Sequence, residues 1–131
     1  MTRSIKIQIL ILLILFFIQG CEKIQLGEPS DYKVGTKYRI NANLSFTIDS
    51  LRDYRCPRNL MCIWSGDVEL YFKIKHNFSN IDTLIYLYTH NNNPFKIDDY
   101  TLQIEEVNPW LKSDEKINQN DYRIKILITK D

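Results

Sequence analysis

The sequence predicts an all-β protein, a small antiparallel β-sandwich that follows an export signal. Apolar and polar residues alternate strictly in several segments, which is the period of a strand with one buried face. After the first 20 residues Ala42 is the single alanine, whereas β-branched and aromatic residues are abundant, so propensity also disfavours helix. Short turns rich in Asn and Asp separate these segments. A partly open β-barrel is one alternative, and an α+β domain with a short helix at residues 109–118 is another.

The first 20 residues have the pattern of an export signal. They contain Arg3 and Lys6, no acidic residue, and ten consecutive apolar residues from 9 to 18. A helix needs roughly 20 apolar residues to span a bilayer, so we interpret residues 1–20 as a removable signal peptide and not as a permanent anchor.

Cys21 is the expected site of lipid attachment. The segment Phe17-Ile18-Gln19-Gly20 before it resembles a bacterial lipobox, in which a small residue precedes the modified cysteine. Gln19 departs from the commonest pattern. The resemblance implies that Cys21 is the lipidated N-terminus of the mature protein, and two or three acyl chains would hold it stably in the membrane. An ordinary secretory signal cleaved nearby is the alternative. Glu22 in place of Asp after the cysteine favours the outer membrane of the cell envelope.

Residues 21–33 are expected to form the lipidated N-terminus and a tether that leads into a first edge strand. Residues 34–131 are expected to form the single β-sandwich domain, because the sequence has no long linker and no internal repeat.

Five segments carry strand periodicity. Residues 38–48 predict one long half-buried strand, or two strands sharing a bend, and residues 68–74 and 122–128 repeat the same alternation. Residues 81–89 are apolar on both faces, which predicts a central strand or one beneath another element. Residues 100–107 predict a strand with a β-bulge near Glu105 and Glu106, since Val107 is out of phase with the residues before it.

Cys56 and Cys62 are expected to form a disulfide, since Cys21 is assigned to the lipid and the exported compartment is oxidising. A zinc site would need about four ligands, and only His76 and His90 are available to join them, without ligand spacing. A redox-active pair usually has two intervening residues at a helix start, unlike this pair.

The residues around these cysteines resemble the signature of a family of small, uncharacterised exported bacterial proteins, many of them lipoproteins. The signature is Arg55-Cys56-Pro57, four further residues, then Cys62-Ile63-Trp64-Ser65-Gly66. Asn108-Pro109-Trp110 and Asn120-Asp121-Tyr122 resemble the C-terminal half of that family. The departures are Tyr54, Ser65 and Trp110, where Ser, Ala and Tyr are usual. The resemblance implies export, the fold and the disulfide, and it transfers no catalytic residue.

Arg55 and Trp64 are the candidate binding residues of this loop. In the structural interpretation Trp64 packs over the disulfide, Arg55 pairs with Asp53 or Asp67, and Gly66 takes a backbone conformation that other residues avoid. In the functional interpretation Arg55 and Trp64 form a recognition surface, because Arg and aromatic residues are typical interface anchors.

No catalytic constellation is recognisable. His76 and His90 have no sequence link to a nucleophile, and the pair Asp98-Asp99 is expected to be solvated. Tyrosines 71, 86 and 88 are expected to serve sheet packing, with an aromatic binding face as the alternative. We therefore expect no enzyme, no cofactor and no metal.

Charge argues against a nucleic-acid partner. Removing Arg3 and Lys6 with the signal leaves 15 Lys plus Arg against 16 Asp plus Glu, a formal charge of −1. The sequence thus predicts a lipid-anchored, non-catalytic binding or envelope-structural module, with a protein or glycan partner in the bacterial cell envelope. The alternative is a periplasmic domain that binds a small ligand or a metal through His76, His90, Asp98 or Asp99.

Overall fold

The computed structural model describes residues 2–16 and 24–131. Cys21, the expected lipidation site, lies outside the described residues. The N-terminal segment forms α1 (Thr2–Phe16), which covers most of the expected signal peptide. Within the described residues, no helix has the length and apolar character needed to cross a membrane.

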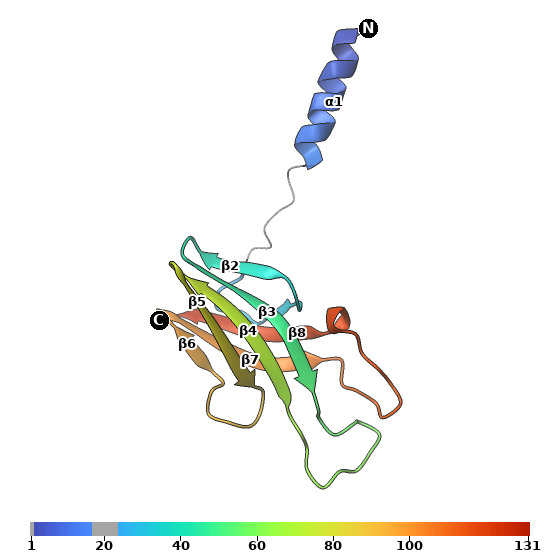
Figure 1. Cartoon of the computed structure of the whole chain (residues 1–131), viewed down its shortest axis with the longest axis vertical. Coiled ribbons are helices and arrows are strands. Elements are labelled where there is room, and N and C mark those ends of the chain that lie inside the picture. Colours follow the sequence, from blue (N-terminus) through green and yellow to red (C-terminus); the bar gives the residue numbers. More distant parts are fainter. Residues whose placement is uncertain (1, 17–23) are drawn as a thin grey trace.

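The domain is a small antiparallel β-sandwich, as the alternation predicted (Figure 1). In the described part of the chain, the strands form two four-stranded sheets, with the orders β2-β3-β4-β5 and β1-β8-β7-β6. The first sheet contains β2 (Lys37–Asn41), β3 (Leu44–Asp53), β4 (Val68–His76) and β5 (Ser79–Tyr86). The second contains β1 (Ser30–Tyr32), β6 (Phe95–Ile97), β7 (Tyr100–Asn108) and β8 (Arg123–Lys130).

The core fills the space between the two sheets with the inward-facing residues of each strand. Among its fully buried side chains are Phe46, Ile48, Leu70, Phe72, Leu102, Ile124, Ile126 and Ile128. Burying each such side chain contributes about 1.5–3 kcal/mol, so this interface supplies the main stabilisation of the fold.

Residues 38–48 are a hairpin and not one long strand. β2 and β3 are joined at Ala42 and Asn43, and the Asn43 amide donates to Asn41 Oδ1 at 2.8 Å. Tyr38 pairs with Phe46, eight positions away. Because this separation is even, both residues face the core and the alternation continues through the turn without a break. The periodicity alone therefore could not locate the turn.

β5 is an edge strand, so the expectation of a central strand at residues 81–89 is wrong. The alternative expectation was a strand that lies beneath another element. It is met only in part, because the connection after β5 contacts the free edge of the strand. The Asn92 side chain accepts a hydrogen bond from the Tyr86 amide at 3.3 Å and donates one to the Leu84 carbonyl at 2.7 Å. The apolar residues of β5 are nevertheless only partly buried: Ile85 is buried, Leu84 and Tyr86 are half-buried, and Ile81 is 43% exposed.

The folded domain begins before residue 34, which corrects the expected boundary. β1 pairs with β8 as the edge strand of the second sheet, and Tyr32 is buried. Earlier still, the Gly27 amide donates to the Ile128 carbonyl at 2.8 Å, and Ile24 packs against the core. The tether is therefore shorter than residues 21–33.

Two further expectations concern the second sheet. The β-bulge is confirmed, since the β7–β8 register shifts between Ile104 and Glu106. Residues 109–118 do not form the helix of the α+β alternative; a short 3-10 helix, η1 (Gln119–Asp121), follows them instead.

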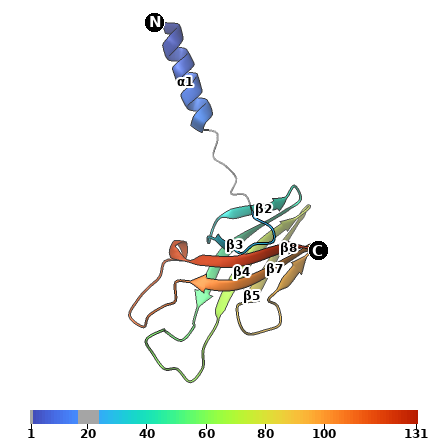
Figure 2. The same cartoon turned by 180° about the vertical axis from the view of Figure 1, so that it is seen from behind.

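The sandwich has two different ends (Figures 1 and 2). The turn end holds the short β2–β3, β4–β5 and β6–β7 turns, together with Gly27 where it meets Ile128. The loop end holds the long connections 54–67, 87–94 and 109–122. β3, with ten residues, runs between the two ends and is about 33 Å long. The ends are therefore separate surfaces.

Candidate functional site

The candidate site is the connection between β3 and β4, residues 54–67, which we call the disulfide loop. The antiparallel pairing of the two strands continues into it, because the Tyr54 amide donates to the Asp67 carbonyl at 3.0 Å and the Cys56 amide to the Ser65 carbonyl at 2.8 Å. The Cys56–Cys62 disulfide, with a Cα–Cα distance of 5.9 Å, then closes the far part of the loop. The predicted disulfide is confirmed.

Gly66 lets the two sides of the loop approach each other. Its φ of +70° is a backbone conformation that side chains disfavour, as the sequence predicted. A Cβ at this position would overlap the Tyr54 carbonyl oxygen and lie 2.8 Å from Arg55 Cα. Only glycine fits here, so residue 66 fixes how tightly the loop base closes.

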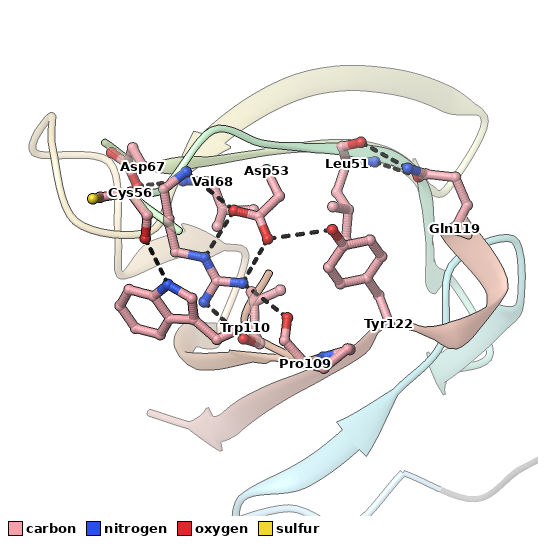
Figure 3. A network of polar contacts seen from close by, with 11 residues as sticks. Leu51, Asp53, Cys56, Asp67, Val68, Pro109, Trp110, Gln119 and Tyr122 are labelled. Carbon is pink, nitrogen blue, oxygen red and sulfur yellow. Dashed lines mark hydrogen bonds and ion pairs between the residues drawn. The ribbon is translucent and has the colours of Figure 1, made fainter. Parts of the chain in front are cut away.

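Arg55, near the start of the disulfide loop, forms a buried ion pair with Asp53, whose carboxylate is labelled in Figure 3. Its Nη2 lies 2.7 Å from Asp53 Oδ2 and its Nε 2.8 Å from Oδ1, with side-chain exposures of 1% and 2%. The guanidinium also donates to the carbonyls of Val107 at 2.9 Å and Pro109 at 3.2 Å. Burial acts to lower the pKa of Arg55, but the hydrogen bonds and charge of Asp53 outweigh it and the pKa is raised. Of the two predicted partners, the structure selects Asp53.

The interpretation of Arg55 as a surface recognition residue is therefore wrong. The guanidinium of Arg55 is buried and already bonded to Asp53 and to two backbone carbonyls, so it is not available to a ligand. Its aromatic neighbour is Trp110, whose ring centroid lies 4.5 Å from the Arg55 guanidinium carbon and whose Nε1 donates to the Cys56 carbonyl at 2.9 Å. Trp110 thus occupies the packing position beside the cysteine that the structural interpretation gave to Trp64.

The segment just before β8 is joined to the end of β3 by two further contacts, also visible in Figure 3. The Tyr122 hydroxyl donates to Asp53 Oδ2 at 3.2 Å, and the Gln119 side chain binds both the amide and the carbonyl of Leu51, at 2.9 and 3.0 Å. Burial, the nearby negative charge of Asp53 and this hydrogen bond raise the pKa of Tyr122 to about 12. The contacts join the two sheets directly below the disulfide loop.

Asp67 fastens the other side of the loop base. Its carboxylate accepts hydrogen bonds from the amides of Val68 at 2.7 Å, Tyr88 at 3.0 Å and Thr89 at 2.8 Å, and from the Thr89 hydroxyl. Burial acts to raise the pKa of Asp67, but these hydrogen bonds outweigh it and hold the pKa below its usual value. The connection after β5 is thereby held against the loop.

The flank of the disulfide loop rests on residues 111–113. The Arg58 amide donates to the Leu111 carbonyl at 2.9 Å, and Asn59 exchanges two hydrogen bonds of 3.0 Å with Ser113. Together with the buried ion pair, these contacts brace the loop against the second sheet.

The far part of this braced loop carries large apolar side chains in solvent, which we call the apolar tip: Leu60, Met61, Ile63 and Trp64. Met61 and Ile63 are fully exposed, Leu60 is 51% exposed and Trp64 72% exposed. Trp64 touches Tyr54, with ring centroids 6.3 Å apart, and does not cover the disulfide. A group of neighbouring exposed apolar residues of this kind marks an interaction site.

Sequence reasoning identified Trp64 and missed the other three members of the apolar tip. A signal was present, because residues 60–64 contain no charged or amide side chain although they belong to a loop. Such a run inside a turn-rich segment conflicts with the polar composition expected of solvent-exposed loops.

The three tyrosines considered as an aromatic face lie on or near the outer side of the first sheet. Tyr71 donates to Glu69 at 3.3 Å, and Tyr86 packs on His90 with ring centroids 4.1 Å apart. Tyr88 lies past the end of β5 and is exposed. The Tyr88 side chain also interacts with Arg55, so each of the three tyrosines has a local partner.

The four residues of the alternative ligand or metal site are not brought together. His76 Nε2 lies 3.5 Å from Asp98 Oδ2 at the turn end, whereas His90 lies at the loop end. In the described parts of the chain, no group of three or more His, Cys, Asp or Glu side chains is arranged to hold a metal ion.

Comparison with protein-family models, curated proteins and solved structures finds no match for this chain.

Proposed function

We propose that the chain is an exported, lipid-anchored binding protein without catalytic activity, and that its disulfide loop captures a protein partner in the cell envelope. The observation that carries this proposal is the apolar tip: Leu60, Met61, Ile63 and Trp64 stand in solvent on a loop that is fixed from below. A contiguous group of exposed apolar side chains on a folded domain is a common mark of an interaction site.

The rigidity of the loop supports a binding role. A disulfide, the Arg55–Asp53 pair and the contacts to residues 111–113 hold the loop before any partner arrives. Pre-ordering reduces the conformational entropy lost on association, which at an interface is about 0.5–1.5 kcal/mol for each immobilised flexible side chain. More of the free energy gained when a partner buries the apolar tip therefore appears as binding affinity.

The chemistry of the apolar tip favours a protein over a glycan. Of the four residues only Trp64 offers a flat ring and a hydrogen-bond donor, whereas Leu60, Met61 and Ile63 offer purely aliphatic or thioether surface. Apolar anchors that enter pockets of a partner supply most of the binding energy in protein interfaces. Trp64 is the anchor of this type that the sequence already indicated.

The place of the apolar tip supports a partner away from the anchoring membrane. The tip lies at the loop end, whereas Ile24 and Gly27, which follow the expected lipidated cysteine closely, meet the core and Ile128 at the turn end. A protein held through Cys21 would then point its apolar tip outward from the bilayer (Figures 1 and 2).

Mass spectrometry of the full-length protein, extracted gently from its own membranes, tests this proposal. We expect the denatured mass to begin at Cys21 and to include acyl groups. We expect the native mass to include a protein partner that is lost from an Ile63→Ser, Trp64→Ser double variant. Ile81→Ser removes an exposed apolar residue of β5 and is the matched control, which should retain the partner. A partner that is equally present in both variants would refute the apolar tip as the binding site, and a mass without acyl groups would refute the anchor.

A further inference from the structure

A second exposed surface lies at the turn end and differs chemically from the apolar tip. Phe78, in the β4–β5 turn, is fully exposed. Lys37 and Arg39 of β2 and Lys75 of β4 are exposed beside it, and the four line a shallow hollow of about 300 Å³. We call these four residues the basic surface. Among the described residues, no carboxylate forms an ion pair with any of its three cations.

The basic surface is close to the expected lipid anchor. Cys21 precedes Ile24 by three residues, a length of chain that spans at most about 11 Å, and Ile24 packs against the core. The segment that resumes at Ile24 leads into β1, and Tyr32 of β1 packs on Tyr38 of β2, the strand that carries Lys37 and Arg39, with ring centroids 4.7 Å apart. A bilayer that held the lipid of Cys21 would therefore lie near this part of the domain.

The charge at the turn end is divided between the sheets. The carboxylates Asp98 and Asp131 belong to the second sheet, where they pair with His76 at 3.5 Å and Lys96 at 3.1 Å. Glu28, next to Gly27, is exposed on the segment that leads to β1. On the first sheet, Asp82 shares a hollow with Lys37 and Lys75, and Asp49 is paired with Lys73 at 3.2 Å. Near β2 the three cations thus outnumber the two carboxylates, Glu28 and Asp82, that form no ion pair within the described residues, whereas residues 21–131 carry a formal charge of −1.

We propose that the basic surface is a second membrane contact, in which the three cations meet anionic lipid headgroups and the Phe78 ring enters the interface of the bilayer that holds Cys21. The inference rests on the proposed function, because the lipid at Cys21 sets which bilayer is near. Each Lys or Arg close to an anionic membrane strengthens binding roughly fivefold, and an aromatic ring at headgroup depth adds apolar burial. Together with the anchor, this contact fixes the orientation of the domain and keeps the apolar tip away from the lipid.

The test places a fluorescent reporter at the tip of the β4–β5 turn. The full-length Phe78→Trp protein is isolated with its lipid and reconstituted into phosphatidylglycerol and phosphatidylethanolamine vesicles that contain a brominated lipid, or into phosphatidylcholine vesicles with the same quencher. The unsubstituted protein gives the background from Trp64 and Trp110. We expect quenching of the residue-78 emission in the anionic vesicles and its loss in the neutral ones.

Paired charge reversals then test the cations. Lys37→Glu with Lys75→Glu, in the Phe78→Trp protein, should abolish the quenching in anionic vesicles. Lys112→Glu with Lys116→Glu makes the same change of charge at the loop end and should leave the quenching intact. Unquenched emission in anionic vesicles, or equal effects of the two pairs, would overturn the proposal.

The denatured mass of the same sample separates this inference from the proposed function. If acyl groups are present and the residue-78 emission is unquenched, the basic surface fails while the anchor stands. If acyl groups are absent, the anchor fails, and the same protein mixed with anionic vesicles tests the basic surface by itself: quenching on binding supports it, and no binding overturns it.

Discussion

The buried charge of Arg55 is compensated by its partners, and the buried charge of Asp53 in turn depends on Arg55. Its guanidinium is almost completely removed from water, yet it donates hydrogen bonds to Asp53, Val107 and Pro109 and lies against Trp110. Removing one partner of a buried ion pair is costly because the other charge stays in the low-dielectric interior without compensation.

We expect Arg55→Ala to lower the free energy of unfolding by about 3–5 kcal/mol, since Asp53 would remain buried and unpaired. The control is Lys96→Ala, which removes a surface ion pair with Asp131 whose members are 70% and 52% exposed, and which should cost less than about 1 kcal/mol. Urea unfolding at neutral pH measures both. Equal losses in the free energy of unfolding would show that the buried Arg55 pair stabilises the fold no more than the exposed Lys96 pair does.

Gly66 and Gly35 allow backbone conformation to be separated from close approach. Both have positive φ, +70° and +80°, but an added Cβ would meet nothing within 4 Å at Gly35 and would meet the Tyr54 and Arg55 backbone at Gly66. Gly35→Ala should therefore cost only the conformational penalty of about 1–2 kcal/mol, and Gly66→Ala clearly more. Thermal unfolding of the two variants gives the comparison, and a similar loss in both would contradict the close approach.

For single residues, the sequence allowed contacts between near neighbours in the chain to be predicted, but not contacts between residues far apart in it. Asp53 and Arg55 are two residues apart on an extended segment, so their pairing could be predicted. Trp110 contacts Cys56 and Arg55 from more than 50 positions away, and no local pattern encodes that contact. The packing role was therefore assigned to the wrong tryptophan.

Among the structural elements, the disulfide loop and the connection after β5 depend on one carboxylate. Asp67, the last residue of the disulfide loop, accepts hydrogen bonds from Tyr88 and Thr89 and so holds two loops together. Its pKa is lower in the folded protein than the ordinary value of 3.8. The corresponding stabilisation is present above pH 3.8 and is lost as the pH falls through the folded-state pKa.

We expect Asp67→Asn to be less stable than the unsubstituted protein by about 1–3 kcal/mol at pH 7, because an amide group would face the Thr89 donors. The difference should shrink as the pH falls below 3.8, where the unsubstituted protein begins to lose the contribution of the carboxylate. Asp49→Asn, at an exposed pair with Lys73, serves as the control and should change little. Unfolding by urea at a series of pH values measures this, and a difference independent of pH would count against the account.

Strand elements were predictable where one face is buried and the other is in water. β4 and β8 follow this rule, and their alternation located them closely. β5 broke it because it carries apolar residues on both faces although it is an edge strand and its outer residues are only partly buried. The β2–β3 turn was hidden because paired residues an even number of positions apart preserve the alternation.

In the whole molecule, the two ends of the sandwich carry different surfaces. The loop end presents the apolar tip, and the turn end presents the basic surface next to the segment that follows Cys21. The fold class followed from periodicity, but the strand order did not, since β1 and β8 pair from opposite ends of the domain. The separation of the two surfaces is a consequence of that order, and only the three-dimensional arrangement reveals it.

Photo-crosslinking in intact cells tests this two-ended arrangement most directly. A photoreactive side chain is placed in the full-length protein either at Met61, in the apolar tip, or at Phe78, in the basic surface. We expect the probe at residue 61 to crosslink to a protein, with the product lost from the Ile63→Ser, Trp64→Ser variant, and the probe at residue 78 to crosslink to lipid. A probe at residue 61 that reacts mainly with lipid, or the same product from both positions, would contradict the account.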